Sequence, residues 1–200
     1  MATVETKRMT AEEFWEWANR PENQDKLYEL DRGEVVEVAR PAEFHGVLCA
    51  WIAHLLWGYA LRRGRGCVCS NDTGLLVERD PDTLRGPDLM FLDERLGLEQ
   101  LSRKFTERIP KLVIEVMSPN DRMTQVNRRI GQYLERGVDL VWLVDADVRS
   151  ITVYRRDRYP LVLDDTEELT GEDVLPDLHF RVSELFTLPA EQAAAEGNES

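Results

Sequence analysis

Two acidic residues stand in apolar surroundings, where their carboxylates could do chemistry. Asp88 follows Pro87 and precedes the apolar run 89–92, and Glu115 lies in the middle of the apolar segment 112–117. A carboxylate in such a strand is costly to bury unless a cation, a metal ion or a proton compensates it. If the two segments are neighbouring strands, both carboxylates can meet at one sheet edge and hold a hard cation such as Mg²⁺. Such an ion can polarise a phosphodiester, whereas the alternative is a buried ion pair between Glu115 and an arginine.

The segment 111–144 has the pattern of a strand, a helix and a second strand. Unbroken apolar composition predicts central strands at 112–117 and 140–144, covered on both faces. Polar residues at 118–121 can cap the intervening helix, and Gly137 is placed to end it. The apolar residues of that helix recur at helical spacing: Met123, Val126, Ile130, Tyr133 and Leu134. The unit predicts a right-handed parallel crossover.

The other predicted elements surround this unit in an α/β arrangement. A helix is expected after the capping box formed by Thr10 and Glu13, and a longer helix over 43–63. Strand pairs are expected at 27–30 with 34–38, 67–69 with 75–78, and 150–155 with 159–163, and Pro87 opens a further strand. These elements predict a single domain over 1–188, followed by a disordered acidic tail over 189–200.

Composition limits the classes of function. The chain is 42% hydrophobic and 32% charged, which suits a globular domain with a sizeable core. No run of eighteen apolar residues and no secretory signal are apparent, so we expect no membrane span and a cytoplasmic location. The net charge of −13 disfavours a nucleic-acid partner, because phosphates are contacted mainly by Lys and Arg. Basic residues cluster locally at 62–65, 103–111 and 155–158, so a nucleic-acid partner stays an alternative.

An ordered set of motifs resembles a known family. Asp88 after Pro87, followed by Glu115 on an apolar strand, looks like the PD-(D/E)XK nuclease superfamily. The full set resembles the Uma2 family of putative restriction endonucleases over roughly 27–187: residues 28–36, His45, Pro87-Asp88, 113–119, 133–138 and 141–145. The resemblance implies a restriction-endonuclease-like core with a mixed central sheet flanked by helices. It also implies a Mg²⁺-dependent (or Mn²⁺-dependent) phosphodiesterase acting on DNA, with Asp88 and Glu115 as metal ligands, in a protein that is often a homodimer.

The sequence departs from the superfamily pattern at the lysine that ends the strand motif. That position holds Met117, and the lysine that the family carries on the following helix corresponds to Arg129. At about 100° per residue, Arg129 lies at the edge of the apolar face and Arg128 on the solvent side. Arg129 could stabilise charge on a phosphate but cannot act as a base.

Accessory groups are expected at His45, at the start of the long helix, and at Glu29, in the first hairpin. His45 and Cys49 have the spacing of a zinc-binding pair, but no further ligands in the sequence match. The alternatives to these accessory roles are that His45 is an ordinary capping or packing residue and that Glu29 lies on the solvent-facing side of its hairpin.

The sequence therefore leads to a Mg²⁺-dependent DNA endonuclease that uses Asp88, Glu115, Arg129, His45 and Glu29. The rival interpretations are a catalytically impaired module that binds nucleic acid or protein, and a structural protein in which Glu115 merely pairs with Arg122 or Arg129. An open cleft around both carboxylates would favour the enzyme, and a Glu115 closed off by a bidentate arginine would favour the structural protein.

Overall fold

A six-stranded mixed sheet forms the centre of the molecule in the computed structural model, which describes residues 8–70, 72–119 and 121–191. Its strand order is β10-β9-β8-β7-β6-β3. Strands β7 (Leu112–Val116) and β8 (Leu140–Asp145) are parallel and lie buried in the middle of the sheet, as their apolar composition predicted. The other neighbouring pairs are antiparallel. The outer strands are β10 (Leu161–Leu163), β9 (Ser150–Arg155), β6 (Leu89–Leu92) and β3 (Cys67–Cys69).

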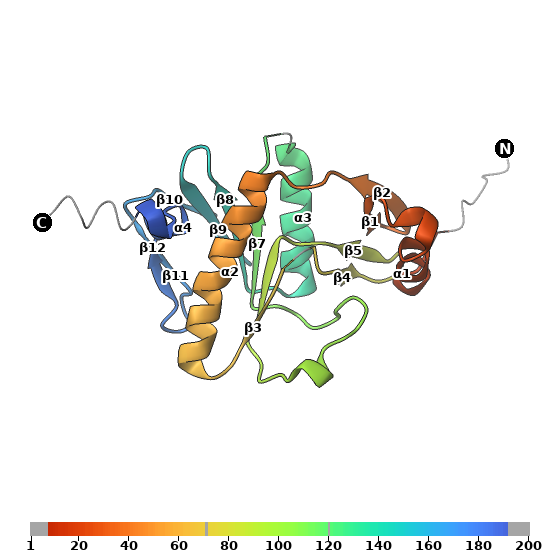
Figure 1. Ribbon diagram of the computed structural model, residues 1–200, viewed down its shortest axis with the longest axis horizontal. Coiled ribbons are helices and arrows are strands. Elements are labelled where there is room, and N and C mark those ends of the chain that lie inside the picture. Colours follow the sequence, from red (N-terminus) through yellow and green to blue (C-terminus); the bar gives the residue numbers. More distant parts are fainter. Residues whose placement is uncertain (1–7, 71, 120, 192–200) are drawn as a thin grey trace, which may run out of the picture.

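Two helices cover the two faces of this sheet (Figure 1). Helix α2 (Glu43–Arg63) packs on one face through Leu48, Ile52 and Leu56, against side chains that include Ile114 and Trp142. Helix α3 (Met123–Arg136) packs on the other face through Val126, Ile130 and Tyr133, against Val113 and Val141. Gly137 ends α3 at φ 112°, the left-handed conformation that glycine adopts most easily. The arrangement confirms the predicted α/β class, with a mixed central sheet flanked by helices.

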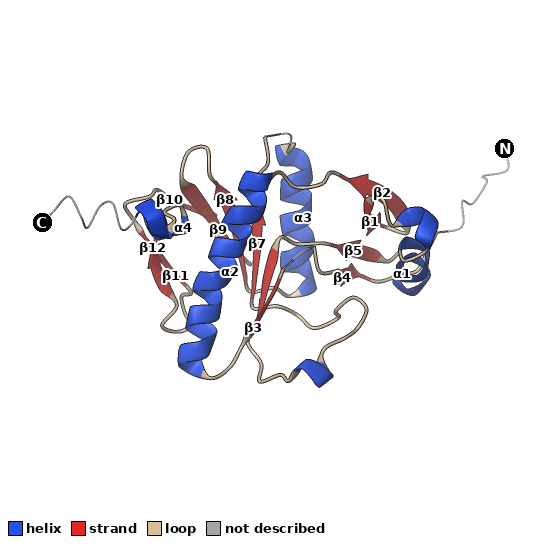
Figure 2. Cartoon of the chain, viewed as in Figure 1, coloured by secondary structure: helices blue, strands red, loops and turns tan. Residues whose placement is uncertain are grey.

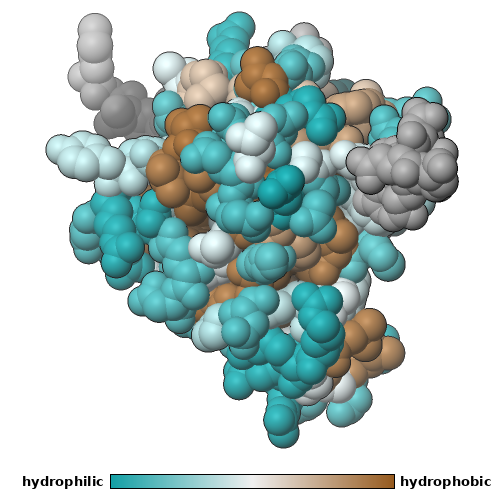
Figure 3. Space-filling view, turned by 90° about the vertical axis from the view of Figure 1, so that its left-hand side faces the viewer, coloured by the Kyte–Doolittle hydropathy of each residue, from teal (hydrophilic) through white to brown (hydrophobic). Residues whose placement is uncertain are grey.

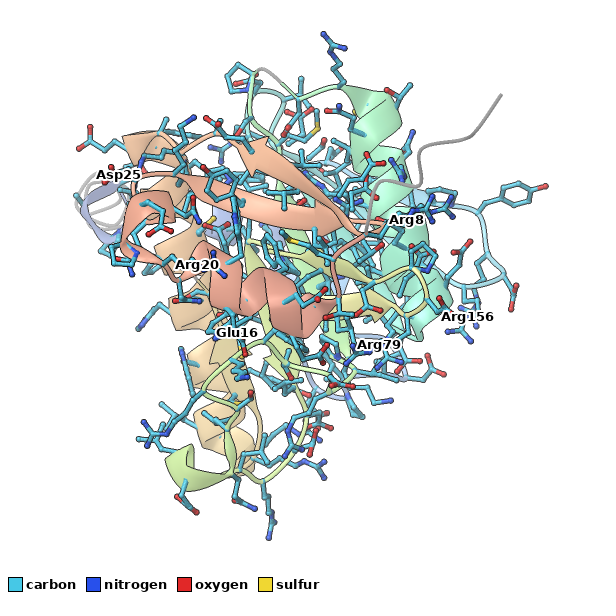
Figure 4. All side chains as sticks on the ribbon, turned by 90° about the vertical axis from the view of Figure 1, so that its right-hand side faces the viewer. Arg8, Glu16, Arg20, Asp25, Arg79 and Arg156 are labelled. Carbon is cyan, nitrogen blue, oxygen red and sulfur yellow. The ribbon has the colours of Figure 1, made fainter. Side chains whose placement is uncertain are left out.

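A second, four-stranded sheet lies beside the first, toward the N-terminal end (Figure 1). Its order is β2 (Glu34–Val38), β1 (Leu27–Asp31), β5 (Thr83–Arg85) and β4 (Leu75–Glu78). Helix α1 (Ala11–Ala18) begins at the predicted capping box of Thr10 and Glu13 and buries Phe14 against this sheet. Arg79 holds α1 in place through an ion pair with Glu12 of 2.9 Å, and Figure 4 shows this end of the molecule.

The C-terminal elements pack on the outer side of α2 (Figure 2). They are the strand pair β11 (Glu168–Thr170) and β12 (His179–Arg181), followed by the short helix α4 (Val182–Leu185). Short 3-10 helices occur at Pro21–Asn23 and Leu98–Gln100. The surface at the C-terminal end is largely hydrophilic, with separate apolar patches (Figure 3).

Two local predictions were wrong. Strand β3 pairs with β6 rather than with β4, which pairs with β5 in the second sheet. The residue that caps the start of α3 is Arg122 rather than a polar residue of 118–121, and the described Asp121 accepts a hydrogen bond from the Ser118 backbone. Of the predicted tail over 189–200, residues 189–191 are described and are helical, and 192–200 lie outside the described residues, so the disordered tail stays a prediction.

Within the described ranges, α2 is the one helix long and apolar enough to cross a membrane by length and composition alone. Only 28% of its most apolar window is buried. Its buried side chains lie against the central sheet, which is the usual place of an apolar core helix.

Candidate active site

The pairing of β6 with β7 brings the two predicted carboxylates together. The strands are antiparallel with Leu89 opposite Ile114, so Asp88, just before β6, lies beside Glu115. The Asp88 Oδ2 atom accepts a hydrogen bond of 2.7 Å from the backbone N–H of Val116. This bond fixes the Asp88 carboxylate at the end of the central sheet.

Both carboxylates line a cleft of about 640 Å³ between the two sheets. All five predicted site residues line it: Glu29, His45, Asp88, Glu115 and Arg129. The structure therefore gathers into one cleft side chains that are far apart in the sequence. Their catalytic roles stay predictions.

Glu115 is buried, and both of its oxygens have partners. Oε2 lies 2.9 Å from an Nη2 atom of Arg129, and Oε1 accepts a hydrogen bond of 2.6 Å from the Tyr133 hydroxyl. Burial raises the pKa of Glu115, and the Arg129 charge opposes this shift. The ion pair joins Arg129 Nη2 to one carboxylate oxygen, and the Glu115 side chain is only 5% exposed, so this carboxylate is both paired and buried.

The two neighbouring arginines of α3 behave differently. Arg129 reaches the carboxylate in the cleft with a side chain that is 26% exposed. Arg128 pairs with Asp31 and is 50% exposed. This is the division between cleft and solvent that helical geometry indicated. Among the described residues, the buried Arg129 Nε atom has no hydrogen-bond partner, so this guanidinium keeps unused donor capacity.

His45 lies at the other side of Asp88. Its Nε2 atom is 3.3 Å from Asp88 Oδ1, and its Nδ1 atom is 3.5 Å from the Cys49 sulfur. The interaction with Asp88, and secondarily that with Cys49, raises the pKa of His45. His45 is thus a neighbour of the carboxylate rather than a residue packed only in the core.

Glu29 has a supporting position in the cleft wall. Its Oε2 atom pairs with the buried Arg85 at 2.9 Å, and its Oε1 atom accepts a hydrogen bond of 2.9 Å from the Gly86 backbone. These contacts hold the segment that leads into Asp88. The alternative of a solvated hairpin position does not apply, because Glu29 is buried.

Sequence reasoning missed two residues at the site, one in the cleft lining and one behind Glu115. Asp72, in the turn before β4, lines the cleft, and its pKa is raised by burial and by the nearby Asp88. Tyr133 was assigned only to the apolar face of its helix, yet its hydroxyl binds Glu115. A signal existed for Tyr133, since a buried tyrosine usually finds a hydrogen-bond partner. No comparable signal existed for Asp72, because aspartate is common in turns.

The residues present fit a hard divalent cation. Asp88, Glu115 and Asp72 offer carboxylate oxygens to one cleft, and such oxygens are the ligands that Mg²⁺ and Mn²⁺ prefer. Burial raises the pKa of both Glu115 and Asp72, and the neighbouring Asp88 carboxylate adds to each shift. Asp88 and Glu115 would hold the cation from two adjacent strands, and Asp72 is a further carboxylate in the same lining.

Fold and site together define an α/β protein with carboxylates converging at the end of a mixed sheet. Comparison with family models then gives the family: residues 11–183 match Uma2, described as putative restriction endonuclease, and the chain belongs to that family. A putative nuclease belonging to DUF820 from Anabaena variabilis has a similar structure, with a TM-score of 0.72 and 18% sequence identity. The match covers 89% of this chain and 97% of that one, which supports the shared fold. No curated protein matches the sequence.

Proposed function

We propose that the protein is a metal-dependent DNA endonuclease that hydrolyses phosphodiester bonds in this cleft. The observation that carries the proposal is the meeting of Asp88 and Glu115 in the cleft, through the register of β6 and β7. Membership of a family of putative restriction endonucleases supports a nucleic-acid substrate. A cytoplasmic location and a homodimer remain predictions from the sequence and the family resemblance.

The chain's own residues divide the work of such a reaction. Asp88 and Glu115 would hold Mg²⁺ or Mn²⁺, which when bound polarises the phosphodiester and lowers the pKa of a water molecule. Arg129 would donate to a phosphate oxygen while it stays paired with Glu115, because the guanidinium has five N–H donors. Tyr133 holds Glu115 in place from the opposite oxygen. His45 orients Asp88 from outside the strand pair.

The cleft lining also includes two cationic side chains, despite the net charge of −13. Lys26 and Arg40 are exposed, and both line the cleft. Lys26 pairs with Glu37 at 2.6 Å and Arg40 donates to the Asp25 backbone carbonyl, so each would exchange a protein contact for one to the DNA backbone.

A second candidate is a nuclease-fold module that binds nucleic acid or a protein partner without cleavage. The ion pair between Glu115 and Arg129 favours it, and so does Met117 at the position of the superfamily's lysine. Because residue 117 is methionine, strand β7 is not followed by a lysine that could assist proton transfer.

A nicking assay on supercoiled plasmid separates the two candidates. The wild type should nick DNA with Mg²⁺ or Mn²⁺ and not with EDTA, and Glu115→Gln should lose the activity. Asp139→Asn is the control, because Asp139 is a partly exposed acid paired with Lys111 outside the cleft lining. Binding of DNA without nicking in the wild type would favour the impaired module, and equal nicking by Glu115→Gln would contradict the assignment of the site.

A further inference from the structure

Three different donor atoms gather at the N-terminal end of α2. A ring nitrogen of His45, the sulfur of Cys49 and a carboxylate oxygen of Asp88 all lie within 4.8 Å of one another. All three residues are half-buried. The set combines nitrogen, sulfur and oxygen, whereas Asp88 and Glu115 offer oxygen alone.

The geometry of the group follows from two elements. His45 and Cys49 are one turn apart on α2, so their side chains lie on the same face of the helix. Asp88 comes from the segment before β6 and faces them, with its Oδ1 atom 3.3 Å from His45 Nε2. Its other oxygen stays on the Val116 backbone N–H, which anchors the carboxylate from the sheet side.

We propose that His45, Cys49 and Asp88 form a binding site for a thiophilic divalent cation of the Zn²⁺ class. Three protein ligands with a water molecule in the fourth position are a common arrangement for zinc sites that keep an open position. Thiolate and imidazole select Zn²⁺ over Mg²⁺, which prefers oxygen ligands. The site is therefore different in chemical preference from the oxygen-lined Mg²⁺ site, although the two share Asp88.

We expect the three side chains to reach one ion by rotation, because their ligand atoms already lie within 4.8 Å of one another. The distance of 3.5 Å between Cys49 Sγ and His45 Nδ1 is already close to the separation of two ligands on one tetrahedral ion. Cys49 faces Nδ1 of the His45 ring and Asp88 faces Nε2. Only one of these nitrogens binds the ion, so the residue that faces the other nitrogen must turn toward the ion. The S–H bond of Cys49 breaks, a metal–sulfur bond forms and the proton leaves to solvent, because a coordinated thiol is deprotonated.

The site has a consequence for the proposed nuclease, and this consequence alone rests on the proposed function. An ion of the Zn²⁺ class that holds Asp88 would keep that carboxylate from Mg²⁺, so Zn²⁺ would inhibit Mg²⁺-dependent cleavage. The binding itself can be measured whether or not the protein cleaves DNA.

A Co²⁺ titration of the purified wild-type protein tests the site directly. We expect a thiolate-to-cobalt charge-transfer band and the visible absorption of tetrahedral Co²⁺, both displaced by Zn²⁺ and not by Mg²⁺. Cys49→Ser should lose the charge-transfer band, and Asp88→Asn should lower the Co²⁺ affinity by about tenfold or more. Cys67→Ser is the matched control, since Cys67 is also a half-buried free cysteine but lies on β3. Absence of the band in the wild type, or its persistence in Cys49→Ser, would overturn the proposal.

A second measurement uses only the wild type, so it does not depend on the folding of a variant. Zn²⁺ should slow the alkylation of Cys49, followed by mass spectrometry of its peptide, and leave the alkylation of Cys67 unchanged. Equal protection of both cysteines, or protection of Cys67 alone, would contradict a site at Cys49.

Discussion

Glu115 is held between a cation and a hydroxyl group, and these two contacts define what each neighbour contributes. Arg129 compensates the charge of the carboxylate, and Tyr133 satisfies its second oxygen. A buried carboxylate that loses such a partner lowers the free energy of unfolding. Removing the Arg129 contact and removing the Tyr133 contact should therefore have different, measurable effects.

Arg129→Met should destabilise the protein and slow cleavage. It leaves the Glu115 carboxylate without its ion-pair partner, and we expect a loss of about 3 kcal/mol in the free energy of unfolding, measured in urea. If Arg129 contacts the phosphate in the transition state, the nicking rate should fall by about ten- to a hundredfold. Arg129→Lys should retain or raise cleavage, because lysine supplies the same charge and is the residue that the family resemblance implies at this position.

Arg128→Met is the internal control for this prediction. Arg128 belongs to the same helix, but its side chain is 50% exposed in its pair with Asp31. Surface pairs of this kind contribute about 1 kcal/mol or less. Equal behaviour of the Arg128 and Arg129 variants in stability and in nicking would remove Arg129 from the site.

Tyr133→Phe should reduce stability while it keeps the packing of the ring. The hydroxyl donates to a carboxylate at 2.6 Å, and a hydrogen bond to a charged group contributes about 1.5–3 kcal/mol. Tyr154→Phe is the comparison, because Tyr154 is a half-buried tyrosine on β9. The free energy of unfolding of both variants is measured in urea. If it falls by the same small amount in both, the Tyr133 hydroxyl does not stabilise Glu115.

At this scale the sequence identified the acids but not the contacts around them. Asp88 and Glu115 stood out because apolar strands rarely contain unpaired carboxylates. The contacts of Glu29 with Arg85, and the approach of Asp72 to the cleft, depend on how the second sheet packs beside the first. No local pattern encodes that packing.

At the scale of elements, the site depends on which strands are neighbours. The crossover from β7 through α3 to β8 was predictable because its apolar periodicity is local and strong. The pairing of β3 was not, because β3 and β4 are close in sequence but belong to different sheets. Short strands carry too few side chains for their pattern to specify a partner.

Replacing either of two glycines by alanine tests this arrangement of the elements, and the two changes in the free energy of unfolding should have opposite signs. Gly66, just before β3, has φ +98°, and a Cβ atom there would clash with the Phe91 ring. Gly131, inside α3, has open space where a Cβ would go. Gly66→Ala should therefore lower the free energy of unfolding by about 1–3 kcal/mol, whereas Gly131→Ala should raise it by about 0.5–1 kcal/mol.

Chemical denaturation of both variants provides the measurement. A stabilising Gly66→Ala change would mean that β3 does not approach β6 as described. A destabilising Gly131→Ala change would mean that this face of α3 is closely packed.

At the scale of the whole molecule, the net charge of −13 must be reconciled with a polyanionic substrate. The exposed Lys26 and Arg40 of the cleft lining would provide local attraction. Replacing both by alanine should weaken DNA binding and reduce the slope of log affinity against log salt by about one for each residue. Binding is best measured in the Glu115→Gln background, which prevents cleavage.

Lys111→Ala is the control for the salt dependence. Lys111 lies just before the start of β7 and pairs with Asp139, outside the cleft lining. A slope that changes equally for Lys111→Ala and for either cleft variant would place the DNA elsewhere on the surface.

The central claim is that Asp88 and Glu115 hold one divalent cation in the cleft, and the melting temperature in Mg²⁺ tests it most directly. A cation that binds only the folded state raises stability with its concentration, and it relieves the repulsion between the two carboxylates. The wild type should melt at a higher temperature as Mg²⁺ rises into the millimolar range, and the Asp88→Asn, Glu115→Gln double variant should show no such shift. No shift in the wild type, or the same shift in the double variant, would contradict a metal site at these residues.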